Sequence, residues 1–240
     1  MSLEKTKKIA DGIDGFLSEK EGEFLYKTAN GCRGEGAIVE IGSWKGKSTV
    51  YLARGSKSGN QVKVYAIDPH RDTSAHRELG VIDTLEEFKQ NIKRARINEI
   101  VEPLVKTSKE ATENWKKPIE FLWIDGDHSY EMVKIDFLLW SPYLIKGGII
   151  AFHDAVSGDP KKVVCKFVLK SNNFLNSGLV DSIFYARRAD NLSLSDKVRN
   201  RIMIILLNLY EFFRGLPLPK SIRQISKKMV NKLTQKNYAT

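Results

Sequence analysis

The chain has 240 residues, of which 42% are hydrophobic and 28% are charged; this composition is typical of a globular protein and excludes a disordered or fibrous one. Its two cysteines, Cys32 and Cys165, lie far apart and match no metal-binding spacing, which excludes a disulfide framework and a thiolate zinc site and favours a reducing, cytoplasmic setting. The first eight residues are mostly polar, and the longest apolar stretch, 202–213, is interrupted by Asn208 and Glu211. We therefore predict neither a secretory signal nor a spanning helix, which needs ~20 apolar residues.

The positive charge is concentrated toward the C-terminal end. The net charge of the chain is +10. Residues 190–240 contain ten Lys and Arg side chains and three acidic ones, so this segment carries +7 and the rest of the chain +3. The basic character is therefore a property of one segment, and a nucleic-acid partner, which would need a broader basic and aromatic surface, is disfavoured.

Short β-branched runs alternate with helical patterns between residues 36 and 154, which is typical of consecutive βαβ units and predicts an α/β fold with a parallel sheet. Residues 3–30 are predicted to form leading helices. The predicted strands are 37–41, 62–67, 100–105, 120–124, 148–152 and a strand-like 181–187. The later predicted helices are 47–54, 84–95, 131–143, 161–170, 199–213 and 221–233. Gly147 and Gly148 are interpreted as the stop signal of the helix 131–143.

These elements divide the chain into three predicted parts. They are an N-terminal helical segment (1–34), an α/β domain (35–188) and a basic, apolar helical tail (189–240). In an open α/β sheet, ligands bind at the carboxyl ends of the strands, near the point where the strand order reverses. Candidate site residues are therefore expected directly after each predicted strand.

A glycine-rich loop follows the first predicted strand and opens the next helix. Its residues are Glu40, Ile41, Gly42, Ser43, Trp44, Lys45, Gly46, Lys47 and Ser48. Only three residues separate Gly42 from Gly46, whereas a Walker A phosphate loop needs four, and a dinucleotide fingerprint would need glycine at Trp44 and Lys47. An ordinary strand-to-helix turn is another alternative. The remaining interpretation is an S-adenosylmethionine loop, in which an acidic residue near the strand end precedes a turn of small residues.

Polar residues also end the second and third predicted strands. Asp68 comes at the end of the second strand, where a carboxylate can accept hydrogen bonds from both hydroxyls of a ribose. The alternative is that Asp68 and Pro69 form a simple turn. Ser108, after the third strand, is predicted to lie beside an adenine.

Two acidic and imidazole-bearing runs follow the fourth and fifth predicted strands. The first is Asp125-Gly126-Asp127-His128-Ser129-Tyr130, and the second is His153-Asp154. Adjacent parallel strands lie roughly 4.8 Å apart, so Asp125 and Asp154 approach one another if these strands pair. Their oxygen ligands suit Mg²⁺ or Mn²⁺. In the alternative interpretation, Asp127 and Ser129 simply cap the following helix.

Taken together, these motifs resemble those of class I S-adenosylmethionine-dependent methyltransferases, and more narrowly the small-molecule and sugar O-methyltransferase group that includes the macrocin type. The resemblance covers about residues 35–170 and rests on the glycine loop, Tyr65-Ala66-Ile67-Asp68-Pro69, the Asp125 run and the Gly147-Gly148 to His153-Asp154 run, in that order. It implies a Rossmann-like, doubly wound, mostly parallel seven-stranded sheet with helices on both faces. The predicted cofactor-binding residues are Glu40, Gly42, Ser43, Trp44, Gly46, Ser48, Asp68, Ser108 and Asp125.

The resemblance also implies an activity. The predicted function is methyl transfer from S-adenosylmethionine to a hydroxyl of a sugar or other small molecule, with His153 as the first and His128 as the second candidate general base and Asp125 beside them. In metal-dependent relatives, a divalent ion such as Mg²⁺ or Mn²⁺ would lie near Asp125 and Asp154. Ala155, however, occupies the position where the catechol and caffeoyl-ester enzymes carry an asparagine ligand.

Two other functions fit parts of the sequence. A phosphotransferase would use the glycine loop for ATP. A non-catalytic module would keep the fold and bind a membrane surface through the segment 199–233, where apolar residues alternate with lysine and arginine. In the enzyme, the same segment is predicted to pack against the core, to form a homo-oligomer, or to place a cytoplasmic protein at the inner membrane surface.

Overall fold

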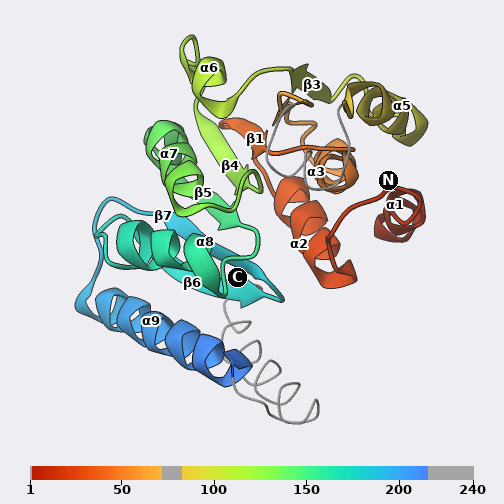
Figure 1. Ribbon diagram of the computed structural model, residues 1–240. Coiled ribbons are helices and arrows are strands. Elements are labelled where there is room, and N and C mark those ends of the chain that lie inside the picture. Colours follow the sequence, from red (N-terminus) through yellow and green to blue (C-terminus); the bar gives the residue numbers. More distant parts are fainter. Residues whose placement is uncertain (1, 72–82, 216–240) are drawn as a thin grey trace.

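The computed structural model describes residues 2–71 and 83–215, which form a three-layer sandwich with one sheet between two layers of helices (Figure 1). The sheet has seven strands in the order β3-β2-β1-β4-β5-β7-β6. The strands are β1 (Ala37–Ile41), β2 (Val64–Ile67), β3 (Val101–Leu104), β4 (Ile119–Ile124), β5 (Leu144–Phe152), β6 (Phe174–Val180) and β7 (Ile183–Arg188). Strands β1 to β5 are parallel, while β7 runs antiparallel to β5 and to β6. The predicted Rossmann-like, mostly parallel seven-stranded fold is confirmed.

Helices cover both faces of the sheet. They are α1 (Leu3–Ala10), α2 (Glu19–Asn30), α3 (Lys47–Ser58), α5 (Leu85–Ala95), α6 (Ser108–Thr112), α7 (Tyr130–Trp140), α8 (Gly158–Val163) and α9 (Leu194–Gly215). A 3₁₀ turn, Ser141–Tyr143, follows α7, and a π-helical segment, Val164–Leu169, follows α8.

The central strands are buried on both faces because each face has its own apolar core. In β1, Val39 and Ile41 belong to the cluster that includes residues of α7, α8 and α9, whereas Ile38 belongs to the cluster with α1, α2, α3 and α5. This alternation follows from the two-residue period of a strand. It explains why β1 and β4 are apolar except for Glu40 and Glu120, since strands covered on both sides are mostly apolar.

The structure differs from the sequence prediction around Gly147 and Gly148. These two glycines do not stop a helix but lie inside β5, which begins at Leu144. Helix α7 ends at Trp140 and gives way to the 3₁₀ turn that contains Pro142, because proline cannot continue the hydrogen bonding of an α-helix. The register between β4 and β5 shifts between Ile119 and Phe121, so the glycines occupy an irregular part of the strand.

The C-terminal part of the described chain is the long helix α9, which packs against β6 and the π-helical segment. Its bounds include the predicted helix 199–213 and extend it at both ends. The predicted helix 221–233 lies outside the described residues. Within residues 2–71 and 83–215, none of the helices combines the length and the apolar composition needed to cross a membrane.

Candidate active site

The glycine loop after β1 packs tightly against the end of β4. Gly42 has φ of +86°, and a Cβ built on it would lie 2.2 Å from the carbonyl oxygen of Asp125. Gly46 has φ of +89° and is the N-cap residue of α3. Only glycine adopts these conformations without strain. Position 42 therefore requires glycine both because of its backbone angle and because there is no room for a side chain. The loop packs directly against Asp125.

Several buried polar atoms of this loop have no hydrogen-bond partner in the described structure. They are Oε1 of Glu40, Oγ of Ser43 and Nε1 of Trp44. Buried polar groups in folded proteins nearly always have a partner, so three such atoms within five residues indicate the place of a polar ligand. The other carboxylate oxygen of Glu40 accepts a hydrogen bond of 2.5 Å from Thr49, and burial raises the pKa of Glu40 to about 8.

Asp68 links the loop to the end of β2. Its Oδ2 accepts a hydrogen bond of 2.8 Å from the backbone amide of Trp44, and its Oδ1 accepts one of 2.7 Å from the amide of His70. The side chain therefore points toward the glycine loop and fixes its shape. Each oxygen keeps a further lone pair, so these contacts leave acceptor capacity for a ligand.

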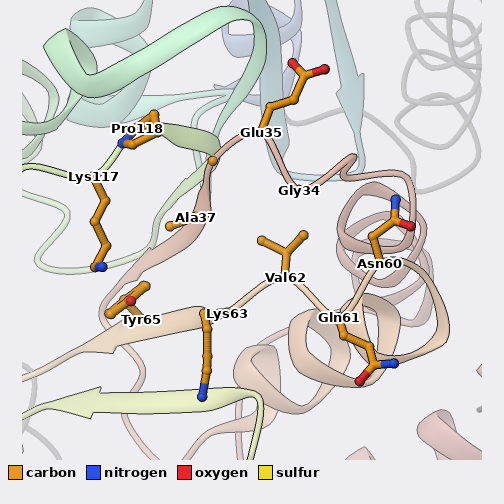
Figure 2. A pocket seen from close by; sticks show the side chains of 11 residues that line it. Gly34, Glu35, Ala37, Asn60, Gln61, Val62, Lys63, Tyr65, Lys117 and Pro118 are labelled. Atoms are coloured by element: carbon orange, nitrogen blue, oxygen red, sulfur yellow. The ribbon is translucent and has the colours of Figure 1, made fainter.

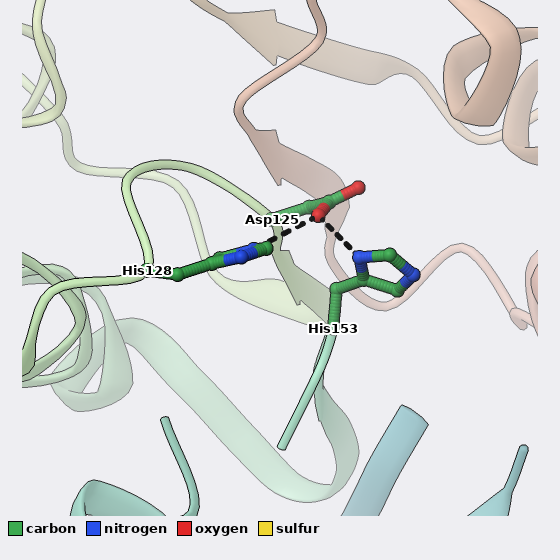
Figure 3. Close-up of side chains that lie close together, drawn as sticks. All are labelled: Asp125, His128 and His153. Carbon is green, nitrogen blue, oxygen red and sulfur yellow. Dashed lines mark ion pairs between the residues drawn. The ribbon is translucent and has the colours of Figure 1, made fainter. Parts of the chain in front are cut away.

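The carboxyl ends of β4 and β5 bring Asp125, His128, His153 and Asp154 together. Figure 3 shows that the rings of His128 and His153 both approach the carboxylate of Asp125. Oδ1 of Asp125 lies 2.9 Å from Nδ1 of His153 and 3.5 Å from Nε2 of His128. Oδ2 of Asp154 lies 3.6 Å from Nδ1 of His128 and 3.7 Å from Nδ1 of His153. The predicted approach of the two strand ends is present, and the two imidazoles lie between the carboxylates.

The two histidines differ in their surroundings. The side chain of His153 is only 4% exposed, whereas that of His128 is 40% exposed. Burial would lower the pKa of His153, but the neighbouring Asp125, Glu21 and Asp154 carboxylates raise it to about 11. Its hydrogen bond to Asp125 raises the pKa of His128 as well. His153 is therefore enclosed among carboxylates that favour its protonated form, and His128 lies at the open side of the cluster.

Part of the chain matches a known protein family. Residues 39–155, which run from β1 to just beyond the His153-Asp154 pair, match the family described as "Methyltransferase domain". This part of the chain is therefore similar to a methyltransferase domain.

Similar proteins are found by sequence and by structure. An uncharacterized protein of Acanthamoeba polyphaga mimivirus is 29% identical over 161 residues, which cover 64% of this chain and 67% of that protein. The O-methyltransferase NovP has a TM-score of 0.60 and 19% identity over 72% of this chain and 81% of its own. An O-methyltransferase from Bacillus cereus in complex with SAH has a TM-score of 0.56 and 20% identity, covering 78% of this chain and 90% of its own.

The glycine loop has the features of a site for a polar ligand. Polar groups gather at the carboxyl ends of β1 and β2: the Asp68 carboxylate and the unpartnered donors of Ser43 and Trp44. Gly42 lies beside them, where any side chain would collide with Asp125. Two other predicted cofactor residues lie on neighbouring helices. Ser48 is buried in the first turn of α3. Ser108 is the first residue of α6, and its Oγ accepts a hydrogen bond of 2.9 Å from Nε1 of Trp140.

Glu21 is a member of the cluster that the sequence analysis missed. It lies on α2, and its Oε2 is 3.8 Å from Nε2 of His153, while its Oε1 accepts hydrogen bonds from the amide (2.8 Å) and hydroxyl (2.7 Å) of Ser182. Burial would raise the pKa of Glu21, but His153 and Ser182 lower it to about 2. In sequence it is visible only as the last residue of a capping box with Ser18, and nothing local indicates its partner 132 positions away.

A separate hollow of about 410 Å³ lies at the opposite edge of the sheet (Figure 2). It is lined by residues that precede or begin β1, β2 and β4, among them Gly34, Val62 and Pro118. These are the amino ends of the strands, whereas the cofactor loop and the histidine cluster lie at the carboxyl ends. The hollow therefore lies apart from the glycine loop and the histidine cluster.

Proposed function

We propose that the α/β domain transfers the methyl group of S-adenosylmethionine to a hydroxyl of a sugar or another small molecule. One observation carries this proposal: the backbone of Asp125 touches the glycine loop at Gly42, while its side chain holds His128 and His153. A donor bound over Gly42 is thus next to groups that can exchange a proton. The names of the Bacillus cereus protein and of NovP, both O-methyltransferases, support oxygen as the accepting atom.

Methyl transfer requires the protein to align the two reactants and to remove one proton. The acceptor oxygen forms a bond to the methyl carbon as the bond from that carbon to the sulfonium sulfur breaks, which leaves S-adenosylhomocysteine. The hydroxyl proton must go to a base, because the product ether oxygen carries none. The domain therefore has to hold both molecules in line and to accept one proton.

We propose His128 rather than His153 as the proton acceptor. A base must reach the acceptor and must be able to take up a proton. The ring nitrogens of His153 both face carboxylates, at 2.9 Å and 3.8 Å, and the side chain is buried, so we assign it a fixed positive charge that orients Asp125. His128 is accessible, and Asp154 lies near its Nδ1. This reverses the order in which the sequence analysis ranked the two residues.

On the cofactor side, we propose that Asp68 accepts hydrogen bonds from the ribose hydroxyls with the lone pairs that Trp44 and His70 leave unused. The unpartnered groups of Ser43 and Trp44 are then available to the polar methionine part of the cofactor. The proposal rests on the shape of the loop, since Asp68 points toward Trp44 and not into solvent.

The cluster also fits a divalent metal ion. One carboxylate oxygen of Asp125 and one nitrogen each of His128 and His153 lie within 4.8 Å of one another. Two imidazoles with one carboxylate suit Mn²⁺ or another transition ion better than Mg²⁺, which prefers oxygen ligands. Glu21 and Asp154 face the second nitrogens of the two rings and would orient them. Such an ion would require both imidazoles to be neutral, so a metal-bound site is an alternative to a cationic His153 with His128 as the base. When bound, the ion would lower the pKa of an acceptor hydroxyl and would take over from His128 in promoting loss of the proton.

Calorimetry with S-adenosylmethionine and with ATP, each with Mg²⁺, tests the class of enzyme. We expect binding of the first compound alone; binding of ATP alone would favour the phosphotransferase. Transfer of a labelled methyl group to a panel of sugars and phenols then tests the acceptor. Methylation of an oxygen supports the proposal, and methylation of nitrogen or carbon alone contradicts it.

A further inference from the structure

Helix α9 is apolar on two opposite faces. One face carries Met203 and Leu207, which are 5% and 0% exposed and pack into the core. On the other side lies a row of large apolar side chains, here named the α9 stripe, which includes Leu194 at 82% and Phe212 at 63% exposure. The α9 stripe consists of Leu194, Val198, Ile202, Ile205, Leu209 and Phe212.

The spacing of these residues makes the α9 stripe continuous. Steps of three and four residues keep side chains on one face of an α-helix, and at 1.5 Å per residue the stripe is about 27 Å long. Proteins rarely leave contiguous apolar surface of this kind without a partner. The helix is also fixed to the domain, because Glu211 accepts a hydrogen bond from the amide of Gly158 and Arg214 donates one to Ser157.

The charges around the α9 stripe indicate the kind of partner. Lys197, Arg199 and Arg201 are exposed on the same helix. The next 25 residues, 216–240, contain six Lys and Arg side chains and no acidic one. A second copy of this chain, with its net charge of +10, would bring positive charge against positive charge, and so would the chain's own residues 216–240. A negatively charged surface complements both the helix and the segment that follows it.

We propose that the α9 stripe, together with Lys197, Arg199 and Arg201 on the same helix, binds the surface of an anionic lipid bilayer. The apolar side chains enter the boundary between headgroups and acyl chains, and the lysine and arginine side chains contact the anionic headgroups. This inference does not depend on the proposed methyl transfer, because the α9 stripe contributes none of the residues described above at the candidate active site.

Sedimentation of the full chain with lipid vesicles tests the proposal. We expect the chain to sediment with phosphatidylcholine vesicles that contain 30% phosphatidylglycerol (about one anionic lipid in three), and to stay in solution with pure phosphatidylcholine vesicles. High salt should release it. In the double variant Ile205→Ser/Phe212→Ser the partition coefficient should fall at least roughly tenfold, because two large side chains no longer leave water. Leu138→Ser, which removes an exposed apolar residue of α7, is the matched control and should bind normally.

A second variant separates charge from apolar contact. Lys197→Gln/Arg201→Gln, at two exposed basic residues of α9, should lower the partition coefficient by about twenty-fivefold, since each basic residue near an anionic surface contributes about fivefold. The lack of sedimentation with anionic vesicles, or normal binding by Ile205→Ser/Phe212→Ser, would overturn the proposal. A wild-type dimer that the same double variant converts to a monomer would also overturn it, because a second copy would then cover the α9 stripe.

Discussion

Substitution of Gly42 by alanine tests whether the glycine loop is shaped by its contact with Asp125. The new Cβ would lie 2.2 Å from the carbonyl oxygen of Asp125 and 2.7 Å from Cα of Gly126, so the loop or the end of β4 has to move. A non-glycine residue at φ of +86° costs about 1–3 kcal/mol, and overpacking against backbone costs a further ~1–3 kcal/mol. We expect the free energy of unfolding to fall by about 2–6 kcal/mol.

Gly34 provides a matched control for this substitution. It has φ of +87°, and a Cβ built on it would meet nothing within 4 Å, so Gly34→Ala carries the backbone strain without the collision. Urea unfolding of both variants measures the difference, and calorimetry measures their affinity for S-adenosylhomocysteine. Gly42→Ala should be the less stable variant and should lose cofactor affinity, whereas Gly34→Ala should keep it. Equal stability and equal affinity of the two variants would refute the reasoning.

Three further predictions concern the same site. The pKa of Glu40 is about 8 in the folded chain against 4.5 in the unfolded chain, so its stabilising contribution is complete below pH 4.5 and is lost as the pH rises to 8. Between these values the free energy of unfolding of the wild-type chain should fall, relative to that of Glu40→Gln, by about 1.4 kcal/mol per pH unit. Urea unfolding of both chains at pH 5 and pH 7.5 measures this, and the same difference in stability at both pH values would contradict it. His128→Ala should lower turnover roughly 10²–10⁴-fold while calorimetry finds unchanged affinity for S-adenosylhomocysteine, and full turnover would remove His128 from the mechanism. Chelation should lower turnover, and Mn²⁺ should restore it better than Mg²⁺; activity indifferent to chelation would argue against the metal.

The sequence predicted the part of the fold that depends on local pattern. Buried strands such as β1 and β4 are recognisable because they are apolar apart from one glutamate each, and the loop after β1 is recognisable by its glycines. Strand β6 was missed because Asn176, Ser177 and Gly178 interrupt its apolar pattern, and Gly178 is there to accommodate the ring of Tyr185. The pairing of β6 with β7 compensates for this weak local signal, and such pairing is not visible in a short stretch of sequence.

The candidate site, like the fold, is predictable from sequence only where it depends on local pattern. The meeting of Asp125 with the end of β5 follows from the neighbouring parallel strands, in which Ile124 pairs with Phe152. The roles of the next two residues depend on backbone geometry instead. His153 points inward to Asp125, while Asp154, at φ of +49°, is directed to the surface and is 54% exposed. Glu21 reaches the site only because α2 packs across the sheet, which no local pattern indicates.

Thermal unfolding with and without S-adenosylhomocysteine tests most directly whether the loop at Gly42 and Asp68 is a cofactor site. A ligand at a hundred times its dissociation constant stabilises the folded chain by about 2.7 kcal/mol. We predict a clear rise in melting temperature for the wild-type chain and a much smaller one for Asp68→Ala. An unchanged melting temperature of the wild-type chain at saturating S-adenosylhomocysteine and S-adenosylmethionine would contradict the assignment of this site.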